Sequence, residues 1–111
     1  MKTALITGAA RGIGLSTTDI LNGQGWHVIM VDRDKTKLFD EALSRSQVTP
    51  LCYDIAQPQQ VDTMIAEALS VQGQIDALVN NGGVADFGHI VDTTFARWRK
   101  VMETNLDGVF L

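Results

Sequence analysis

The sequence has 111 residues, of which 45% are hydrophobic and 20% are charged, the composition of one ordinary globular domain with its own core. The net charge of −4 and the lack of any basic run argue against nucleic acid as a partner. No apolar stretch is long enough to span a bilayer, so we expect no membrane partner. The single cysteine, Cys52, excludes an internal disulfide and suits the reducing cytoplasm, which is the location we expect.

Four short apolar runs, punctuated by Gly or Asp, predict strands that are buried on both faces. They cover Thr3–Thr7, His27–Asp32, Val48–Asp54 and Ala77–Asn80. Helical segments separate them, and repeated strand–helix–strand units imply a parallel sheet with helices on both faces. We therefore predict an α/β fold with a Rossmann-like, doubly wound parallel sheet in the strand order 3-2-1-4. Pro50 agrees with this order, because proline cannot donate to a sheet ladder and strand three lies at an edge.

Four helices are predicted around these strands. The first covers about 12–24 and stops at Gly25, and Asp34 caps a second helix, which turns Leu38 and Ala42 inward. The third opens at Gln57-Pro58, closes at Gly73 and has an apolar face of Val61, Met64, Ile65, Ala68 and Leu69. The fourth begins near Thr94 and continues to the end of the chain, with Trp98, Met102, Asn105 and Val109 on one stripe.

A glycine-rich loop joins the first strand to the first helix. Gly8, Gly12 and Gly14 follow the apolar run 4–6, and Asp32 comes eighteen residues after Gly14. A helix N-terminus attracts a pyrophosphate, glycines let the backbone approach it, and an acid on the next strand can bind the ribose. The spacing G-x-x-x-G-x-G differs from the G-x-G-x-x-G fingerprint and is a weak signal alone, so a plain strand–helix turn is the alternative. Its position, together with Asp32, favours a dinucleotide site.

Five motifs together resemble the classical short-chain dehydrogenase/reductase (SDR) family, over essentially the whole chain. They are Thr7-Gly8-x-x-x-Gly12-x-Gly14, Asp32, Asp54-Ile55, Asn80-Asn81-Gly82-Gly83, and Asn105 within Glu103-Thr104-Asn105-Leu106. The resemblance implies an oxidoreductase that transfers a hydride between a nicotinamide and a small-molecule alcohol or carbonyl substrate. It also implies that residues 1–111 form a single, partial NAD(P)-binding Rossmann domain. Gly82 departs from the family, whose members typically have Asn-Asn-Ala-Gly there.

The resemblance assigns cofactor contacts throughout the chain. The predicted contacts are Gly8, Arg11, Gly12, Ile13, Gly14, Asp32, Arg33, Asp54, Ile55, Asn81, Gly82 and Gly83. Family members place the acid at Asp54 against the adenine ring, and the loop around Asn81 against the ribose and nicotinamide. Simpler interpretations stay open for both motifs, since Asp54 also suits a turn or helix cap and Asn-Gly is a common turn pair.

Asp32 also bears on the choice of cofactor. Its carboxylate would accept hydrogen bonds from the adenosine ribose and repel an added 2′-phosphate, which favours NAD over NADP. Arg33 opposes this preference, because a neighbouring arginine can accommodate that phosphate. At close range we expect the repulsion from Asp32 to dominate.

Asn105 is the predicted catalytic residue. It lies on the apolar stripe of the fourth helix, and a buried amide must find hydrogen-bond partners. The resemblance makes it a member of the catalytic tetrad, which positions water and the catalytic lysine. Bonding to neighbouring backbone is a second hypothesis and is compatible with the first. We find no metal-ligand spacing and expect no metal.

The other catalytic residues of the family are missing from the chain. The family uses a serine and a Tyr-x-x-x-Lys pair, whereas the only tyrosine here is Tyr53 and the fourth residue after it is Gln57. We therefore expect an N-terminal cofactor-binding half, truncated within the fourth helix and inactive alone. It would pair with a missing C-terminal half or assemble as a homo-oligomer. A truncated module that binds NAD without catalysis is the alternative.

Overall fold

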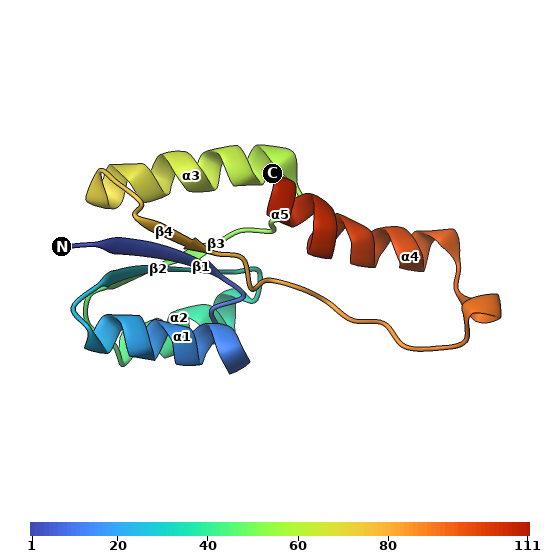
Figure 1. Ribbon diagram of the computed structural model, residues 1–111, viewed down its shortest axis with the longest axis horizontal. Helices are drawn as coiled ribbons and strands as arrows, with labels where there is room; N and C mark the ends of the chain where they lie inside the picture. The colour runs from blue at the N-terminus through green and yellow to red at the C-terminus, as the bar shows by residue number, and fades with distance from the viewer.

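A four-stranded parallel sheet forms the centre of the computed structural model, which describes all 111 residues. Its strands are β1 (Thr3–Thr7), β2 (His27–Asp32), β3 (Val48–Cys52) and β4 (Ala77–Val79). They lie in the order β3-β2-β1-β4, as predicted (Figure 1). Pro50 lies on the edge strand β3, in register with Met30 of β2. The Rossmann-like prediction is therefore confirmed.

Helices cover both faces of this sheet. α1 (Gly12–Gly23) and α2 (Lys35–Leu43) lie on one face and α3 (Pro58–Gln72) lies on the other (Figure 1). After β4 an extended segment leads away from the sheet through a short 3₁₀ turn, η1 (Ile90–Asp92). The chain then returns through α4 (Phe95–Met102), the π-helical turn η2 (Glu103–Asp107) and α5 (Gly108–Phe110), which ends beside the start of α3.

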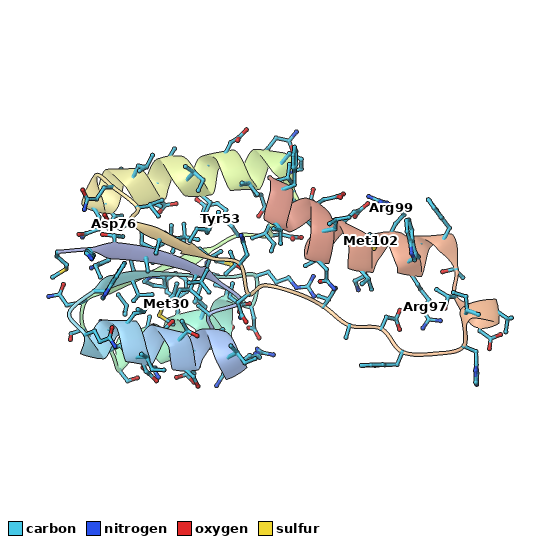
Figure 2. All side chains as sticks on the ribbon, viewed as in Figure 1. Met30, Tyr53, Asp76, Arg97, Arg99 and Met102 are labelled. Carbon is cyan, nitrogen blue, oxygen red and sulfur yellow. The ribbon has the colours of Figure 1, made fainter.

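The core has two layers because alternate residues of each strand point to opposite faces. Toward α3 lie Leu5, Ile29, Val31 and Leu51, packed with Val61, Met64 and Ala68 of that helix. Toward α1 and α2 lie Ile6, Val28 and Met30, packed with Ala9, Ala10, Leu38 and Ala42. Figure 2 shows Met30 and Tyr53 on these two opposite sides of the sheet. The predicted inward positions Leu38 and Ala42 are confirmed.

Local signals in the sequence set most helix ends. The Asp34 carboxylate accepts a hydrogen bond from the Lys37 N–H at 3.2 Å and caps α2. Pro58 is the first residue of α3, and Gly73 ends it in the left-handed region with a φ of 77°. Proline is tolerated in the first turn of a helix, and glycine readily adopts the left-handed conformation that ends one. Both ends of α3 therefore lie where the sequence predicts them.

Three boundaries and positions differ from the predictions. β3 ends at Cys52 rather than Asp54, because the Asp54 carboxylate accepts the Ala56 N–H at 2.9 Å and turns the chain. β4 ends at Val79 rather than Asn80. Leu69 is 42% exposed. With 3.6 residues per turn, a residue eight positions after Val61 has rotated to the flank of the helix.

The prediction of one continuous fourth helix is wrong. A π-helical turn with Asn105 at its centre divides it into α4 and α5. The expected stripe is only partly covered, since Trp98 is 46% and Val109 is 48% exposed and Asn105 is exposed as well. The buried residue of this turn is Thr104. Apolar periodicity could not indicate a π turn, because that signal assumes a uniform helix.

β4 forms an open edge of the sheet. It pairs with β1, and no strand pairs with its other edge; Leu78 within it is 55% exposed. An open edge presents unpaired N–H and C=O groups to another chain segment. None of the helices combines the length and apolar character required to cross a membrane.

Gly14 permits the closest contact in the structure. A Cβ built on this buried residue would lie 2.2 Å from the Gly8 carbonyl oxygen and 2.7 Å from Asn81 Nδ2. The Gly8 oxygen belongs to the backbone and cannot swing aside. Glycine is therefore required here so that the first turn of α1 can lie against the loop after β1.

We expect Gly14→Ala to lower the free energy of unfolding by about 2–3 kcal/mol, because the added methyl overpacks this contact. Gly23→Ala, at the other end of α1, is the matched control because a Cβ there meets nothing within 4 Å. It should raise stability by about 0.4–1 kcal/mol through the unfolded-state entropy. Urea unfolding of both variants measures the difference, and equal effects would contradict the close-contact argument.

Candidate functional site

A cleft of about 430 Å³ opens at the carboxyl ends of β1, β2 and β4. Nine predicted cofactor contacts line it: Gly8, Arg11, Asp32, Arg33, Asp54, Ile55, Asn81, Gly82 and Gly83. Five residues of its lining were not predicted: Val31, Asp34, Tyr53, Val84 and Thr104. Gly12, Ile13 and Gly14 are not among the lining residues. The structure therefore brings together residues from five parts of the chain that lie far apart in the sequence.

Asp32 links the glycine loop to the turn after β2. One carboxylate oxygen accepts the Ala10 N–H at 3.1 Å, and the other accepts the Asp34 N–H at 3.0 Å. An ionised carboxylate offers about four acceptor positions. Two of them hold the protein backbone, so about two remain for a ligand in the cleft.

The glycine loop places the start of α1 beside this carboxylate. Gly8 and Gly12 both have left-handed φ angles, of 65° and 56°. Arg11 is the N-cap of α1, yet its side chain makes no capping hydrogen bond to the helix. The N–H groups of the first helical turn have no acceptor within the helix itself, so this N-terminus can accept an anion.

Two arginines lie at the Asp32 end of the cleft. Arg11 forms an ion pair with Asp34, while Arg33 is exposed and pairs with no carboxylate. Both guanidiniums are permanently charged. The charges here are therefore mixed, with cations and carboxylates side by side.

Asp54 and Tyr53 form the wall toward α3. Asp54 serves as a turn residue: its backbone N–H donates to Gln60 and its carboxylate accepts from the Ala56 N–H at 2.9 Å. The Tyr53 hydroxyl donates to Glu67 of α3, and this hydrogen bond to a carboxylate raises the pKa of Tyr53. The tyrosine ring is thus anchored at its hydroxyl end, and it stays protonated at neutral pH.

Thr7 joins the end of β1 to the loop after β4. Its hydroxyl oxygen accepts the N–H groups of Asn81 at 3.0 Å and Gly82 at 2.8 Å. In return, Asn81 Nδ2 donates to the carbonyl oxygens of Thr7 and Gly8, both at 3.2 Å. Thr7 was part of the quoted motif but was not predicted as a site residue. A threonine that precedes the glycine loop is the signal that could have indicated it.

Gly82, the departure from the family pattern, contacts Ile55. A Cβ at Gly82 would lie 2.9 Å from Ile55 Cδ1 and 3.1 Å from Thr7 Oγ1. The same isoleucine packs against Gly108, where a Cβ would lie 3.0 Å from it. Ile55 therefore occupies the space beside Gly82 and connects the cleft wall to α5.

Asn105 forms two hydrogen bonds with the loop after β4. Its Oδ1 accepts the Val84 N–H and its Nδ2 donates to the Val84 carbonyl, both at 2.8 Å. The amide thus pairs with one backbone residue as a neighbouring strand would. The prediction that this residue is buried was wrong, because Asn105 is exposed. The backbone-bonding hypothesis describes its contacts.

No group of three or more His, Cys, Asp or Glu side chains has a geometry that could hold a metal ion. The polar groups that line the cleft are backbone N–H groups, carboxylates, an amide, guanidiniums and the hydroxyls of Tyr53 and Thr104. Such a set suits a ligand with ribose hydroxyls and phosphates.

Comparison with known proteins agrees with this arrangement. The model of the family described as short chain dehydrogenase matches residues 2–111. The chain belongs to the short-chain dehydrogenase family. The 3-ketoacyl-(acyl-carrier-protein) reductase from Brucella melitensis, solved in complex with NADH, superposes with a TM-score of 0.96 at 31% identity. That match covers 99% of this chain and 46% of the reductase.

The curated relatives of this short-chain dehydrogenase are named for several different activities. An NAD-dependent glycerol dehydrogenase from Listeria innocua is 33% identical over 99% of the chain and 44% of its own length. A 3-oxoacyl-(acyl-carrier-protein) reductase from Staphylococcus epidermidis is 34% identical, and the match covers 98% of the chain and 47% of the reductase. The chain therefore spans about half the length of the curated relatives it matches.

We expect Thr7→Val to release the loop after β4. The exchange keeps the size of the side chain but leaves the N–H groups of Asn81 and Gly82 without their acceptor, at a cost of about 1–3 kcal/mol. Hydrogen exchange at these two amides should accelerate strongly. Thr7→Ser keeps the oxygen and is the control: its two amides should stay protected, and equal acceleration in both variants would contradict the role of the hydroxyl.

Proposed function

We propose that this chain binds NAD in the cleft at the ends of β1, β2 and β4, as the cofactor-binding half of an NAD-dependent short-chain dehydrogenase. The observation that carries the proposal is the convergence of the glycine loop, Asp32 and the Asn81 loop on one cleft. When bound, NAD supplies the nicotinamide ring that exchanges a hydride with the substrate. The chain itself binds and orients this cofactor.

The residues present fit such a ligand. The N-terminus of α1, which no side chain caps, would hold the pyrophosphate with its N–H groups and its positive dipole end. Gly8 would keep the wall of the cleft close to the phosphates without a side chain. The two free acceptor positions of Asp32 match the two hydroxyls of the adenosine ribose. Asp54 and Ile55 would contact the adenine ring.

We further propose a preference for NAD over NADP. A 2′-phosphate would have to lie close to Asp32, and the repulsion between the two anions opposes its binding. Arg33, exposed and unpaired, would reduce this penalty without removing it. The names of two relatives are compatible with this preference: the NAD-dependent glycerol dehydrogenase and the reductase solved with NADH.

The proposed reaction is hydride transfer between the nicotinamide and an alcohol or carbonyl group. Relatives named for glycerol, hydroxysteroids and 3-oxoacyl groups all support this substrate class. Asn105 would contribute to catalysis by fixing the Val84 backbone at the edge of the cleft. The reaction would also need residues that this chain lacks, since four residues after Tyr53 comes Gln57 rather than Lys.

These residues would come from a C-terminal half, because a second copy of the chain lacks them too and could only complete a homo-oligomer. The open edge of β4 and the exposed side of α4 and α5 are the surfaces proposed for this association. The thiol of Cys52 is free. We take this as support for a reducing, cytoplasmic location.

The test of the cofactor proposal is titration of the chain with NAD and NADP. We expect NAD to bind more tightly, and Asp32→Asn to reduce the ratio of the two affinities by roughly tenfold, because one close negative charge is removed. Asp62→Asn, an exposed acid on α3, changes the net charge equally and should leave the ratio unaltered. Absence of NAD binding, or binding that is indifferent to Asp32→Asn, would contradict the proposal.

A second test is the activity of the isolated 111 residues. We expect no NADH formation from secondary alcohols, because losing the general acid–base pair alone lowers the rate by about 10²–10⁴. Activity should appear when a segment carrying the family serine and Tyr-x-x-x-Lys is supplied together with this chain. Turnover by the 111 residues alone would refute the division of the site into two parts, and tight NAD binding without any rescue would favour a non-catalytic binding module.

A further inference from the structure

The two arginines of the cleft differ in whether they form an ion pair. Arg11 is held in an ion pair with Asp34, whereas Arg33 makes no such pair. Arg11 follows Ala10, whose N–H donates to the Asp32 carboxylate, so its backbone is fixed beside the residue proposed to bind the ribose. A guanidinium in this position lies within the same cleft as Asp32.

Hydrogen bonds other than its pair with Arg11 hold Asp34 in position. Its Oδ1 caps α2 by accepting the Lys37 N–H, and its Oδ2 accepts from Arg11 Nη2. Its own backbone N–H donates to Asp32. The carboxylate is therefore oriented by the helix that it caps, independently of Arg11. The Lys37 N–H, and in addition Arg11, hold the pKa of Asp34 below its usual value, so it is charged at neutral pH.

We propose that Asp34 is a specificity-determining residue: by pairing with Arg11 it withholds a guanidinium that could otherwise bind the 2′-phosphate of NADP. This inference rests on the proposed dinucleotide site and deepens it. A 2′-phosphate near Asp32 would meet that carboxylate, while the guanidinium of the glycine loop is already paired with Asp34. Asp32 thus repels the phosphate directly. Asp34 acts indirectly, by pairing with the Arg11 guanidinium that could otherwise serve as the counter-ion of the phosphate.

The size of the effect follows from exposure. The side chains of Arg11 and Asp34 are 62% and 43% exposed. Exposed ion pairs shift an equilibrium by at most about fivefold. Arg11 can therefore be released by a single substitution at Asp34, and the gain in phosphate binding is of that order.

The experiment compares two probes, 5′-AMP and 2′,5′-ADP, which differ only by the 2′-phosphate. Their dissociation constants are measured on the full chain for the parent and for Asp34→Asn. Asn is as good an N-cap as Asp, so α2 should keep its first turn, which circular dichroism checks. We expect the affinity for 2′,5′-ADP relative to 5′-AMP to rise about fivefold. Asp34→Ser is a second cap-preserving variant with the same expected change.

Two controls separate the pair from general charge effects. Asp40→Asn removes an exposed acid of the same helix that forms no ion pair, and should change the ratio by less than about twofold because solvent screens it. In an Arg11→Gln background the gain from Asp34→Asn should disappear, since no guanidinium remains to be released. A gain that survives in Arg11→Gln, or an equal gain in Asp40→Asn, would overturn the inference and leave the dinucleotide site intact. If the parent binds neither probe, the proposed function itself fails.

Discussion

The close approach of Gly14 to the Gly8 carbonyl oxygen is the constraint on which the rest of the site depends. It lets α1 begin directly against the loop after β1, with Asn81 filling the remaining space from the far side. Because a Cβ at Gly14 would lie only 2.2 Å from the Gly8 oxygen, any other residue would push the helix away from the sheet end. The helix N-terminus, the Asp32 carboxylate and the loop after β4 would then no longer face one cleft. The chemistry proposed for this cleft is thus a consequence of backbone packing.

The polar side chains in and beside the cleft differ in whether they keep hydrogen-bonding positions free. Asp32 uses one acceptor position of each oxygen for the loop backbone, and the others stay free. Thr7 and Asn105, in contrast, use their polar groups on the loop that carries Gly82 and Val84. Asp32 thus keeps acceptor positions that a ligand could use, while Thr7 and Asn105 fix the shape of the loop. This division explains why a predicted site residue can be exposed and yet bonded to the backbone through both amide atoms, as Asn105 is.

The sequence predicts the fold well where the signal is local or strictly periodic. β1 and β2 match the apolar runs, and the cap at Asp34, the start at Pro58 and the stop at Gly73 follow from single residues. Periodicity fails where tertiary contacts decide, as in the π turn around Asn105. The motifs indicated most of the cleft lining, but Asp34 and Tyr53 have no signature of their own. The sequence indicates Asp34 only as a helix cap. The fold shows that it also pairs with Arg11, which lies 23 residues earlier in the sequence.

The charges of the cleft show how it could bind an anion at all. Three carboxylates, those of Asp32, Asp34 and Asp54, face two guanidiniums, and one of these is already paired. Side-chain charge therefore does not attract a phosphate here, and long-range attraction is weak for a chain with a net charge of −4. What remains is the set of N–H groups at the start of α1, whose dipoles act only at short range. The NAD preference proposed for this cleft rests on this arrangement, which would favour a ligand whose charge is low and central, with neutral hydroxyls toward the acids. A pyrophosphate between two nucleosides has that distribution, and an additional phosphate on the ribose does not.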